Sequence, residues 1–369
     1  MRNVGVVTYS NTIDNYGQVL QYLATQEFLK EFDYKSFLLR VKQKNPLWKR
    51  VIRPFYRLMK NVICHSKKDA ISKQKGKEIR LWHTVSDKME QKHPRYFEIF
   101  RRKFFNIVED YDLPKYKFDF FCVGSDQTWS EPPYVYFLEF APKDCARFSI
   151  APSIGHKPVT SEFVNNVRNA LAAFSFITVR EKSGLELCQK AGRSDAHLVL
   201  DPTFLMSSEK YQSFASSLEK KRPYIFLYLL GADISIKVED VFEFAEKNNL
   251  DVKYVASQGR NDDFPKIYAP VEDWLSLMAN ADYVMTNSFH GTALSIIHHK
   301  KFMVFPVVGI LSSLNERIEN IANEFSLKER IYSNSLEDIF SPIDWSCVDS
   351  VISKNRELMV SLMKTLEKK

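Results

Sequence analysis

Cysteine is scarce in this sequence of 369 residues. The five cysteines are odd in number and widely separated, and none belongs to a Cys-x-x-Cys pair. They are Cys64, Cys122, Cys145, Cys188 and Cys347. Closely spaced thiols are what zinc sites and disulfide frameworks require, so the pattern predicts reduced structural thiols and no metal site.

Glycine is also rare, with 11 residues, and no apolar run approaches the roughly 20 residues that a membrane-spanning helix needs. The sequence shows no internal repeat. It opens on an apolar strand at 4–9, without the charged start and long apolar stretch of a secretory signal. Because 45% of the residues are apolar and 14% aromatic, we expect a well-packed globular enzyme rather than a disordered protein. Since the sequence shows neither a membrane span nor a secretory signal, we expect it to be soluble and cytoplasmic.

The length predicts two domains, because a single core usually stops growing at roughly 250–300 residues. Apolar strands alternate with amphipathic helices, which is the pattern of βαβ units, and Asp201-Pro202-Thr203 interrupts it. We therefore predict an α/β fold of two Rossmann-like, doubly wound domains facing a cleft, at 1–200 and 201–348, followed by a C-terminal helix at 349–369. Strands are predicted at 4–9, 35–39, 118–124, 147–151, 176–180, 197–200, 224–230, 251–255, 281–285 and 302–305, and helices at 17–29, 95–105, 161–173, 182–191, 238–247 and 271–279.

Positive charge is concentrated between residues 42 and 103. This segment holds 19 Lys plus Arg against 5 Asp plus Glu, a net charge of +14, whereas the whole chain carries +7. Within it, apolar residues recur at helical spacing over 45–63, which predicts a basic amphipathic helical insertion. Two interpretations remain open: the insertion lies on an anionic membrane at the inner face, or it packs on its own domain. No nucleic-acid-binding module surrounds the charge, so nucleic acid is not expected as a partner.

The most informative motif is Asn287-Ser288-Phe289-His290-Gly291-Thr292. It joins the predicted strand at 281–285 to a helical pattern that follows. Gly291 and Thr292 would then lie in the first helical turn, where unpaired amides favour a phosphate or carboxylate beside His290. The alternative is that Asn287 or Ser288 only caps the helix and that His290 is a hydrogen-bonded surface residue.

Three further motifs share this pattern of polar residues after a strand. They are Asp14-Asn15-Tyr16-Gly17-Gln18, Gly124-Ser125-Asp126-Gln127-Thr128-Trp129 and Arg180-Glu181-Lys182-Ser183-Gly184. Together, in this order, the four motifs resemble the polysaccharide pyruvyl transferase family over nearly the whole chain. The resemblance implies a fold like that of the two-domain GT-B glycosyltransferases, and we expect the four motifs to converge on one cleft.

Members of that family transfer the enolpyruvyl part of phosphoenolpyruvate onto two hydroxyls of a sugar, which gives a cyclic pyruvate ketal and phosphate. The resemblance therefore implies phosphoenolpyruvate as co-substrate, with no other cofactor and no metal. It places the essential histidine at His290, as proton donor or phosphate ligand, and a donor-binding arginine at Arg180. The alternative for Arg180 is a salt bridge with a neighbouring acid. The remaining donor-binding residues are predicted to be Asn287, Ser288, Phe289, Gly291 and Thr292.

This chain departs from the family at Ser288, where other members often carry an arginine. The backbone amides of Gly291 and Thr292, with the Ser288 hydroxyl, could replace part of that charge. Lys300, Lys301 and Arg317 are other candidates, although nothing in the sequence directs them to the site.

The acceptor sugar is expected to meet short amides and carboxylates. The predicted acceptor-binding residues are Asp14, Asn15, Tyr16, Gly17, Gln18, Gly124, Ser125 and Gln127, with Asp126 as the base that accepts a hydroxyl proton. The alternative for these residues is turn formation and helix capping. Tyr16, Trp129 or Trp274 could stack on a pyranose, although for Trp274 a core position is favoured.

The sequence thus favours a pyruvyl transferase acting on a surface polysaccharide or a lipid-linked repeat unit. One alternative is a GT-B-type sugar-nucleotide glycosyltransferase, and another is a non-enzymatic scaffold with a degenerate site. The acceptor sugar, the hydroxyls joined, the ketal stereochemistry and the oligomeric state are not determined by these motifs.

Overall fold

A computed structural model describes residues 1–9, 11–41, 84, 87–130, 134–155 and 158–366. The predicted amphipathic segment at 45–63 lies outside these described residues, as does most of the basic insertion. Within the described part of the chain, no helix is both long enough and apolar enough to span a membrane.

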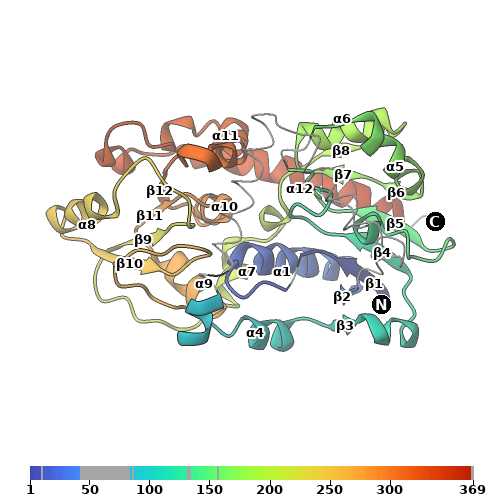
Figure 1. Ribbon diagram of the computed structural model, residues 1–369, viewed down its shortest axis with the longest axis horizontal. Helices are drawn as coiled ribbons and strands as arrows, with labels where there is room; N and C mark the ends of the chain where they lie inside the picture. Colours follow the sequence, from blue (N-terminus) through green and yellow to red (C-terminus); the bar gives the residue numbers. More distant parts are fainter. Residues whose placement is uncertain (10, 42–83, 85–86, 131–133, 156–157, 367–369) are drawn as a thin grey trace, which may run out of the picture.

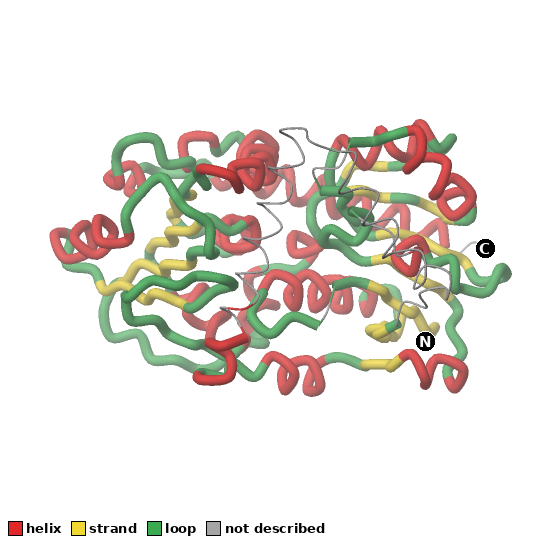
Figure 2. The backbone as a smooth tube through the Cα atoms, in the orientation of Figure 1, coloured by secondary structure: helices red, strands yellow, loops and turns green. Residues whose placement is uncertain are grey.

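Two parallel sheets form the two lobes of the molecule, which lie side by side in Figure 1. The N-terminal lobe contains a sheet of order β3-β2-β1-β4-β5-β6, and the C-terminal lobe one of order β10-β9-β11-β12. Figure 2 shows the strands as two separate groups with helices around each. The strands of the first sheet are β1 (Arg2–Val7), β2 (Tyr34–Arg40), β3 (Ile107–Glu109), β4 (Phe120–Val123), β5 (Ala146–Ser149) and β6 (Phe174–Phe176). Those of the second are β9 (Tyr224–Tyr228), β10 (Asp251–Val255), β11 (Tyr283–Thr286) and β12 (Lys301–Val304).

The predicted α/β fold with Rossmann-like parallel sheets is confirmed. Every strand pair within the two sheets is parallel, for example Val4↔Ser36 and Val284↔Phe302. The helices are α1 (Tyr16–Lys30), α4 (Phe97–Phe104), α5 (Ser161–Ala172), α6 (Lys182–Lys190), α7 (Ser208–Gln212), α8 (Val238–Lys247), α9 (Val271–Asn280), α10 (Phe289–Ile297), α11 (Asn315–Glu324) and α12 (Trp345–Leu366). The division into domains at residue 201 stays a prediction.

One predicted strand was wrong. Residues 176–180 do not continue the main sheet, because the chain leaves it after β6. The next strand, β7 (Thr178–Val179), pairs with β8 (His197–Leu198) in a small sheet of its own. This change of partner matters for the site, because Arg180 follows β7 and Asp201 follows closely after β8.

The strand orders place the loops that carry the motifs where the direction of winding changes. In open parallel sheets, such switch points leave a crevice at the carboxyl ends of the strands. In the first sheet the switch lies between β1 and β4, and in the second between β9 and β11. The loop after β1, the loop after β4 and the turn from β11 into α10 carry three of the four sequence motifs.

Helix α1 lies between the lobes, and nearly all its side chains are buried, including the polar Gln21 and Thr25. Tyr16, at its first position, stacks on Trp274 of α9 with ring centroids 5.1 Å apart. This contact joins the N-terminal lobe to the C-terminal lobe through an apolar core. The start of α1 is thereby fixed against the second lobe, close to the motif that contains His290.

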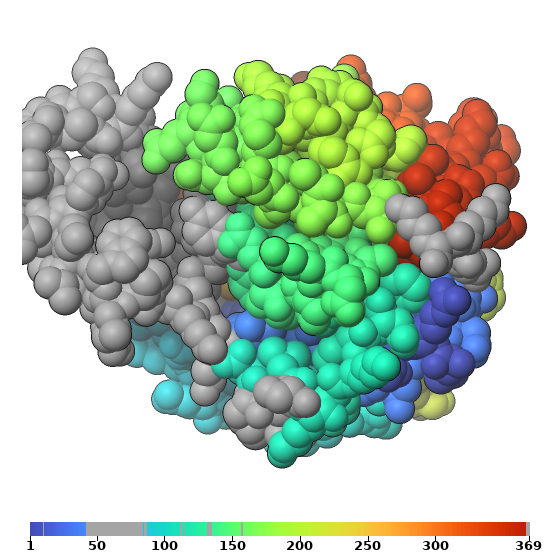
Figure 3. Space-filling model, turned by 90° about the vertical axis from the view of Figure 1, so that its right-hand side faces the viewer, coloured from blue at the N-terminus to red at the C-terminus, as the bar shows by residue number. Residues whose placement is uncertain are grey.

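The C-terminal helix is longer than predicted and returns to the N-terminal lobe. Asn355 Oδ1 in α12 accepts a hydrogen bond from Leu200 N at 2.8 Å, and Arg356 donates to the Leu205 carbonyl at 2.7 Å. In Figure 3, C-terminal residues, in red, and N-terminal residues, in blue, lie on the same side of the molecule. Both lobes are thus tied together by α12 as well as by α1.

Candidate functional site

Asp201 is the centre of a buried polar cluster between the lobes. Its side chain has no exposed surface. Oδ2 accepts hydrogen bonds from Arg180 Nη1 at 2.7 Å and from Ser125 Oγ at 2.9 Å. Oδ1 accepts from the amide and the hydroxyl of Thr203, at 3.0 and 2.9 Å. His290 Nε2 lies 3.9 Å from Asp201 Oδ2. The motifs that contain Ser125, Arg180 and His290 therefore meet at Asp201.

Two side-chain nitrogens in this cluster have no partner in the described part of the chain: Arg180 Nη2, and His290 Nε2, which is a donor in the forms of the imidazole that protonate it. The exposed fraction is 6% for the Arg180 side chain and 12% for that of His290. The Phe289 ring lies 5.0 Å from the Arg180 guanidinium carbon and holds it by a cation–π contact. Buried polar atoms are almost always hydrogen-bonded, so these two nitrogens are available to a ligand with acceptor oxygens.

The charged groups of the cluster shift one another's pKa values. Burial acts to raise the pKa of Asp201, but His290 and Arg180 outweigh it and lower the pKa. Burial lowers the pKa of His290, although Asp201 and Asp126 oppose the shift. For Arg180, burial acts to lower the pKa, and the surrounding carboxylates reverse the effect and raise it. At neutral pH the site therefore combines a charged Arg–Asp pair with a neutral imidazole.

The first motif reaches this cluster through Gly17. A Cβ atom added at Gly17 would lie 2.0 Å from His290 Nδ1 and 2.3 Å from its Cγ. The imidazole therefore packs directly on the backbone of the first turn of α1, where any side chain would displace it. The expected convergence of the motifs is observed for Gly17, Ser125, Arg180 and His290.

The start of α10 corrects one prediction. Ser288 is the N-cap, and its hydroxyl accepts a hydrogen bond from Gly291 N at 3.3 Å. Thr292 N donates to the Ser288 carbonyl at 2.9 Å. Neither amide is free to hold a donor anion, because the helix cap and the helix itself use both. Asn287 is also structural, since its Oδ1 accepts from Leu230 N at 2.7 Å.

Several predicted acceptor residues are also structural. Tyr16 has no exposed surface, and its hydroxyl donates to the Ala269 carbonyl at 2.6 Å, so its ring cannot stack on a sugar. Trp129 is fully buried in the same way, and the favoured core position of Trp274 is confirmed. Asn15 caps α1 by accepting a hydrogen bond from Gln18 N at 3.3 Å. Gln127 packs beside Gly155.

Asp14 and Gln18 instead line a cavity of about 820 Å³ beside the cluster. The cavity is also lined by Thr8 and Tyr9, directly after β1, by residues 11–13 and by Tyr136. Gln258 lines it from the second lobe. Such a volume suits a small ligand or one or two sugar rings. Thr8 Oγ1, in the lining, donates to the Ser125 carbonyl at 2.8 Å, and Gln18 directly follows Gly17, so the chain connects this cavity to the cluster.

Asp126, the predicted base, is buried beside the cluster. Its backbone is left-handed, with φ of 74°, and its Oδ1 accepts from Gln127 N at 2.8 Å. Gly124 N donates to the Val7 carbonyl, which keeps this loop at the end of β1. Among the described residues, no cluster of His, Cys, Asp and Glu is arranged to hold a metal ion.

Sequence reasoning missed Asp201 as a site residue and interpreted it as a domain boundary. The sequence feature that could have identified Asp201 is its position: it is an acidic residue shortly after a predicted strand and directly before Pro202. Lys300 and Lys301, considered as extra cations, donate to the carbonyls of Ala279 and Phe340 and serve the fold.

We expect Asp201→Asn to lower the free energy of unfolding at pH 7 by about 3 kcal/mol, because it leaves Arg180 buried without its counter-ion. Because the pKa of Asp201 is lowered in the folded state, this stabilisation is present above the unfolded value and disappears as the pH falls below about 4. Urea titration of both proteins at several pH values measures the difference. Asp195→Asn is the control, because Asp195 pairs with Arg193 at the surface, where we expect a loss below about 1 kcal/mol. If both variants lose the same free energy of unfolding, the Asp201–Arg180 pair does not stabilise the fold as a buried ion pair.

Comparison with known proteins adds a family and a set of distant folds. The sequence profile of a family described as polysaccharide pyruvyl transferase matches residues 15–307 of this chain. No curated protein sequence matches the chain at a significant level.

Solved structures resemble the chain at low identity. One is UDP-GlcNAc 2-epimerase from Neisseria meningitidis bound to UDP-GlcNAc, with 10% identity, a TM-score of 0.49, and coverage of 99% of this chain and 100% of that one. Another is a putative UDP-N-acetylglucosamine 2-epimerase from Listeria monocytogenes, with 9% identity, a TM-score of 0.48, and coverage of 100% and 97%. These likenesses are too distant to carry an argument about activity.

Proposed function

The chain belongs to the polysaccharide pyruvyl transferase family, and from that membership we propose that it transfers the enolpyruvyl group of phosphoenolpyruvate onto two hydroxyls of a sugar. The observation that carries the proposal is the pair of buried, unpartnered donors, Arg180 Nη2 and His290 Nε2. They come from different lobes and face the same carboxylate, Asp201. Phosphoenolpyruvate carries a phosphate and a carboxylate, both of which supply the acceptor oxygens that these donors lack.

The reaction balances with one donor and one diol. A proton adds to the methylene carbon of phosphoenolpyruvate and makes the neighbouring carbon electrophilic. One sugar hydroxyl adds to that carbon and loses its proton. The bond to the phosphate oxygen then breaks with its electron pair, and the second hydroxyl adds and loses its proton. Of the two protons released, one balances the proton taken up at carbon and the other leaves with the phosphate.

We assign three roles within this scheme. Arg180 binds an anionic group of the donor through Nη2, while Asp201 and Phe289 hold the guanidinium in place. His290 is placed to donate a hydrogen bond or a proton from Nε2. Asp126, which interacts electrostatically with both residues, is the base that accepts a hydroxyl proton.

The acceptor sugar is proposed to occupy the cavity lined by Asp14, Gln18 and Gln258. Carboxylate and amide groups can hydrogen-bond neighbouring sugar hydroxyls. Tyr9 and Tyr136, whose ring centroids lie 5.2 Å apart, add an aromatic wall. We infer an acceptor in a surface polysaccharide or a lipid-linked repeat unit. The lipid linkage rests on the sequence of the basic segment, which lies outside the described residues.

The test is acceptor-dependent phosphate release. The protein is incubated with phosphoenolpyruvate and with galactose-, mannose- or hexosamine-containing oligosaccharides, and phosphate and product mass are measured. The expected product is heavier than the acceptor by one pyruvate less one water. If calorimetry shows no binding of phosphoenolpyruvate but does show binding of a nucleoside diphosphate, the proposal is wrong and the glycosyltransferase alternative is favoured.

A further inference from the structure

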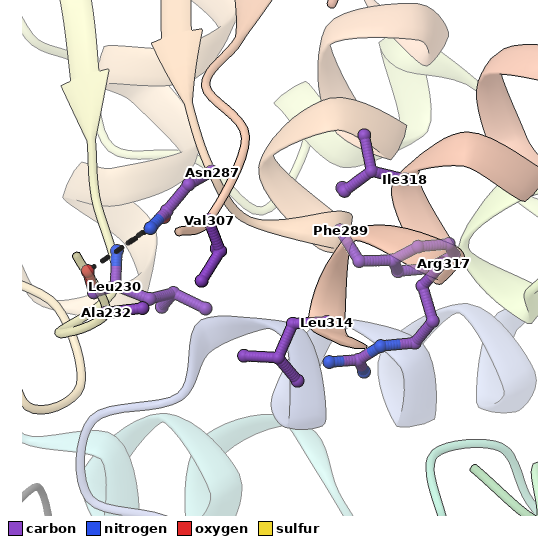
Figure 4. A pocket seen from close by; sticks show the side chains of 8 residues that line it. All are labelled: Leu230, Ala232, Asn287, Phe289, Val307, Leu314, Arg317 and Ile318. Carbon is purple, nitrogen blue, oxygen red and sulfur yellow. Dashed lines mark hydrogen bonds between the residues drawn. The ribbon is translucent and has the colours of Figure 1, made fainter. Parts of the chain in front are cut away.

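Arg317 is a cation at the site whose role the fold does not explain. It lies in α11, a helix that was not predicted from the sequence, and its side chain lines a small cavity with Phe289 and Asn287 at the start of α10. Figure 4 shows the side chain extending past Phe289, with the guanidinium at its far end and Ile318 well away from it. The other lining residues are apolar: Leu230, Ala232, Val307, Leu314 and Ile318. The Asn287 side chain is hydrogen-bonded to the backbone N–H and carbonyl of Leu230, so the side chains that line this cavity offer the guanidinium no free acceptor.

Three buried arginines of this chain are used by the fold. Arg147 donates to the Ala141 carbonyl at 2.7 Å, Arg101 to the Thr12 carbonyl at 2.7 Å, and Arg330 to the Pro342 carbonyl at 2.9 Å. Arg317 is half-buried, and no hydrogen bond or ion pair joins it to the part of the chain that the structure describes. Its Nε is buried without a partner, as is that of Arg330, but Arg330 is bonded through its other nitrogens. Since an unsatisfied buried donor is costly, this arrangement suggests an absent ligand.

The surroundings of Arg317 are those of the candidate site. Burial lowers its pKa, and the positive charge of Arg180 lowers it further, while Asp126, Glu181 and Asp201 oppose the shift. These carboxylates already have partners. Asp201 pairs with Arg180, and Glu181 Oε1 accepts from the amides of Ile154 and Gly155 at 2.6 and 3.2 Å. Two guanidinium groups that repel one another would be stabilised by an anion that binds both.

We propose that Arg317 binds one of the two anionic groups of phosphoenolpyruvate while Arg180 binds the other. This assignment rests on the proposed function, because it takes phosphoenolpyruvate as the donor. The planar fork of arginine suits either a phosphate or a carboxylate. Arg317 thereby supplies the second fixed positive charge, which the capped amides of Gly291 and Thr292 cannot provide.

The test compares Arg317→Gln with the wild-type protein in binding and in kinetics. We expect the Kd and the KM for phosphoenolpyruvate to rise about 10- to 100-fold, which is the effect of losing a hydrogen bond between charged groups. The kcat should change much less, and Arg317→Lys should restore part of the affinity. The melting temperature of Arg317→Gln should equal or exceed that of the wild type, because the substitution removes a partly buried cation that has no partner.

Arg222→Gln is the matched control, because Arg222 is an exposed arginine of the same lobe that pairs with Asp251. It should leave the affinity unchanged. If the wild type binds phosphoenolpyruvate and Arg317→Gln binds it equally well, the assignment is overturned and the proposed function stands. If the variant loses stability together with affinity and Arg317→Lys restores neither, Arg317 is structural and the assignment is also overturned. If the wild type itself does not bind phosphoenolpyruvate, the proposed function fails and this assignment fails with it.

Discussion

Replacing His290 with asparagine is expected to lower acceptor-dependent phosphate release about 10³-fold, within the range for loss of a general acid or base. The imidazole is held by Gly17 on one face and lies 3.9 Å from Asp201, so an asparagine cannot place a titrating group at the same position. Steady-state phosphate release with a saturating acceptor measures the effect. The melting temperature should change little, because Nε2 makes no hydrogen bond with the described residues.

His299→Asn is the matched control for this experiment. His299 follows the same helix, but its side chain is 42% exposed and bonds Asp349 at the surface. Its backbone is left-handed, with φ of 49°, a conformation that asparagine tolerates. We expect its activity to stay within about twofold of the wild type, as for other surface substitutions. A His290→Asn protein that keeps full activity would remove the histidine from the mechanism.

Proton uptake distinguishes the two roles considered for His290. Because burial lowers its pKa, the imidazole is neutral at pH 7 before the donor binds. An anionic donor in contact with Nε2 favours the charged form, so binding at pH 7 should take up a proton if His290 becomes the acid. Calorimetry in two buffers with different ionisation enthalpies measures this uptake, and His290→Asn should abolish it. Tight binding without proton uptake would instead indicate a neutral hydrogen-bond donor to the phosphate.

Gly17→Ala is the second substitution with a large expected effect. The new Cβ would overlap the His290 ring, with three ring atoms within 2.6 Å, so the imidazole must move. A displacement of about 1 Å at a catalytic group can lower the rate about 10²-fold, and overpacking costs about 1–3 kcal/mol of stability. We therefore expect activity and melting temperature to fall together.

A double-mutant cycle shows whether Gly17 acts through His290. In a His290→Ala background the space beside Gly17 is open, so the second substitution should reduce activity no further. It should even raise stability by about 0.5–1 kcal/mol, because alanine favours a helix more than glycine does. If Gly17→Ala reduces the residual activity of His290→Ala by a further large factor, the contact with the imidazole is not its main role.

Most strands and their order along the chain followed from the sequence, but β3 was not predicted. Helix α8 was predicted with its exact ends and α5 and α9 nearly so, because their apolar residues recur at helical spacing between clear end signals. The split of 176–180 into two strands was missed, since short apolar runs do not reveal which strand will be their partner. Helix α11 was also missed, and the sequence offered Arg317 only as a cation that nothing directed to the site.

What the sequence determined by itself was the class of fold, the family and the four motifs, because local patterns of apolar and polar residues fix strands, helices and the turns between them. Only the tertiary structure decided which motif residues face one another. In that structure, Tyr16 and Asn287 have structural roles, Asp201 pairs with Arg180, and Arg317 lies beside Phe289. The physical reason is that hydrogen-bond satisfaction and close packing depend on neighbours distant in the chain, such as Gly17 against His290, which local spacing does not record.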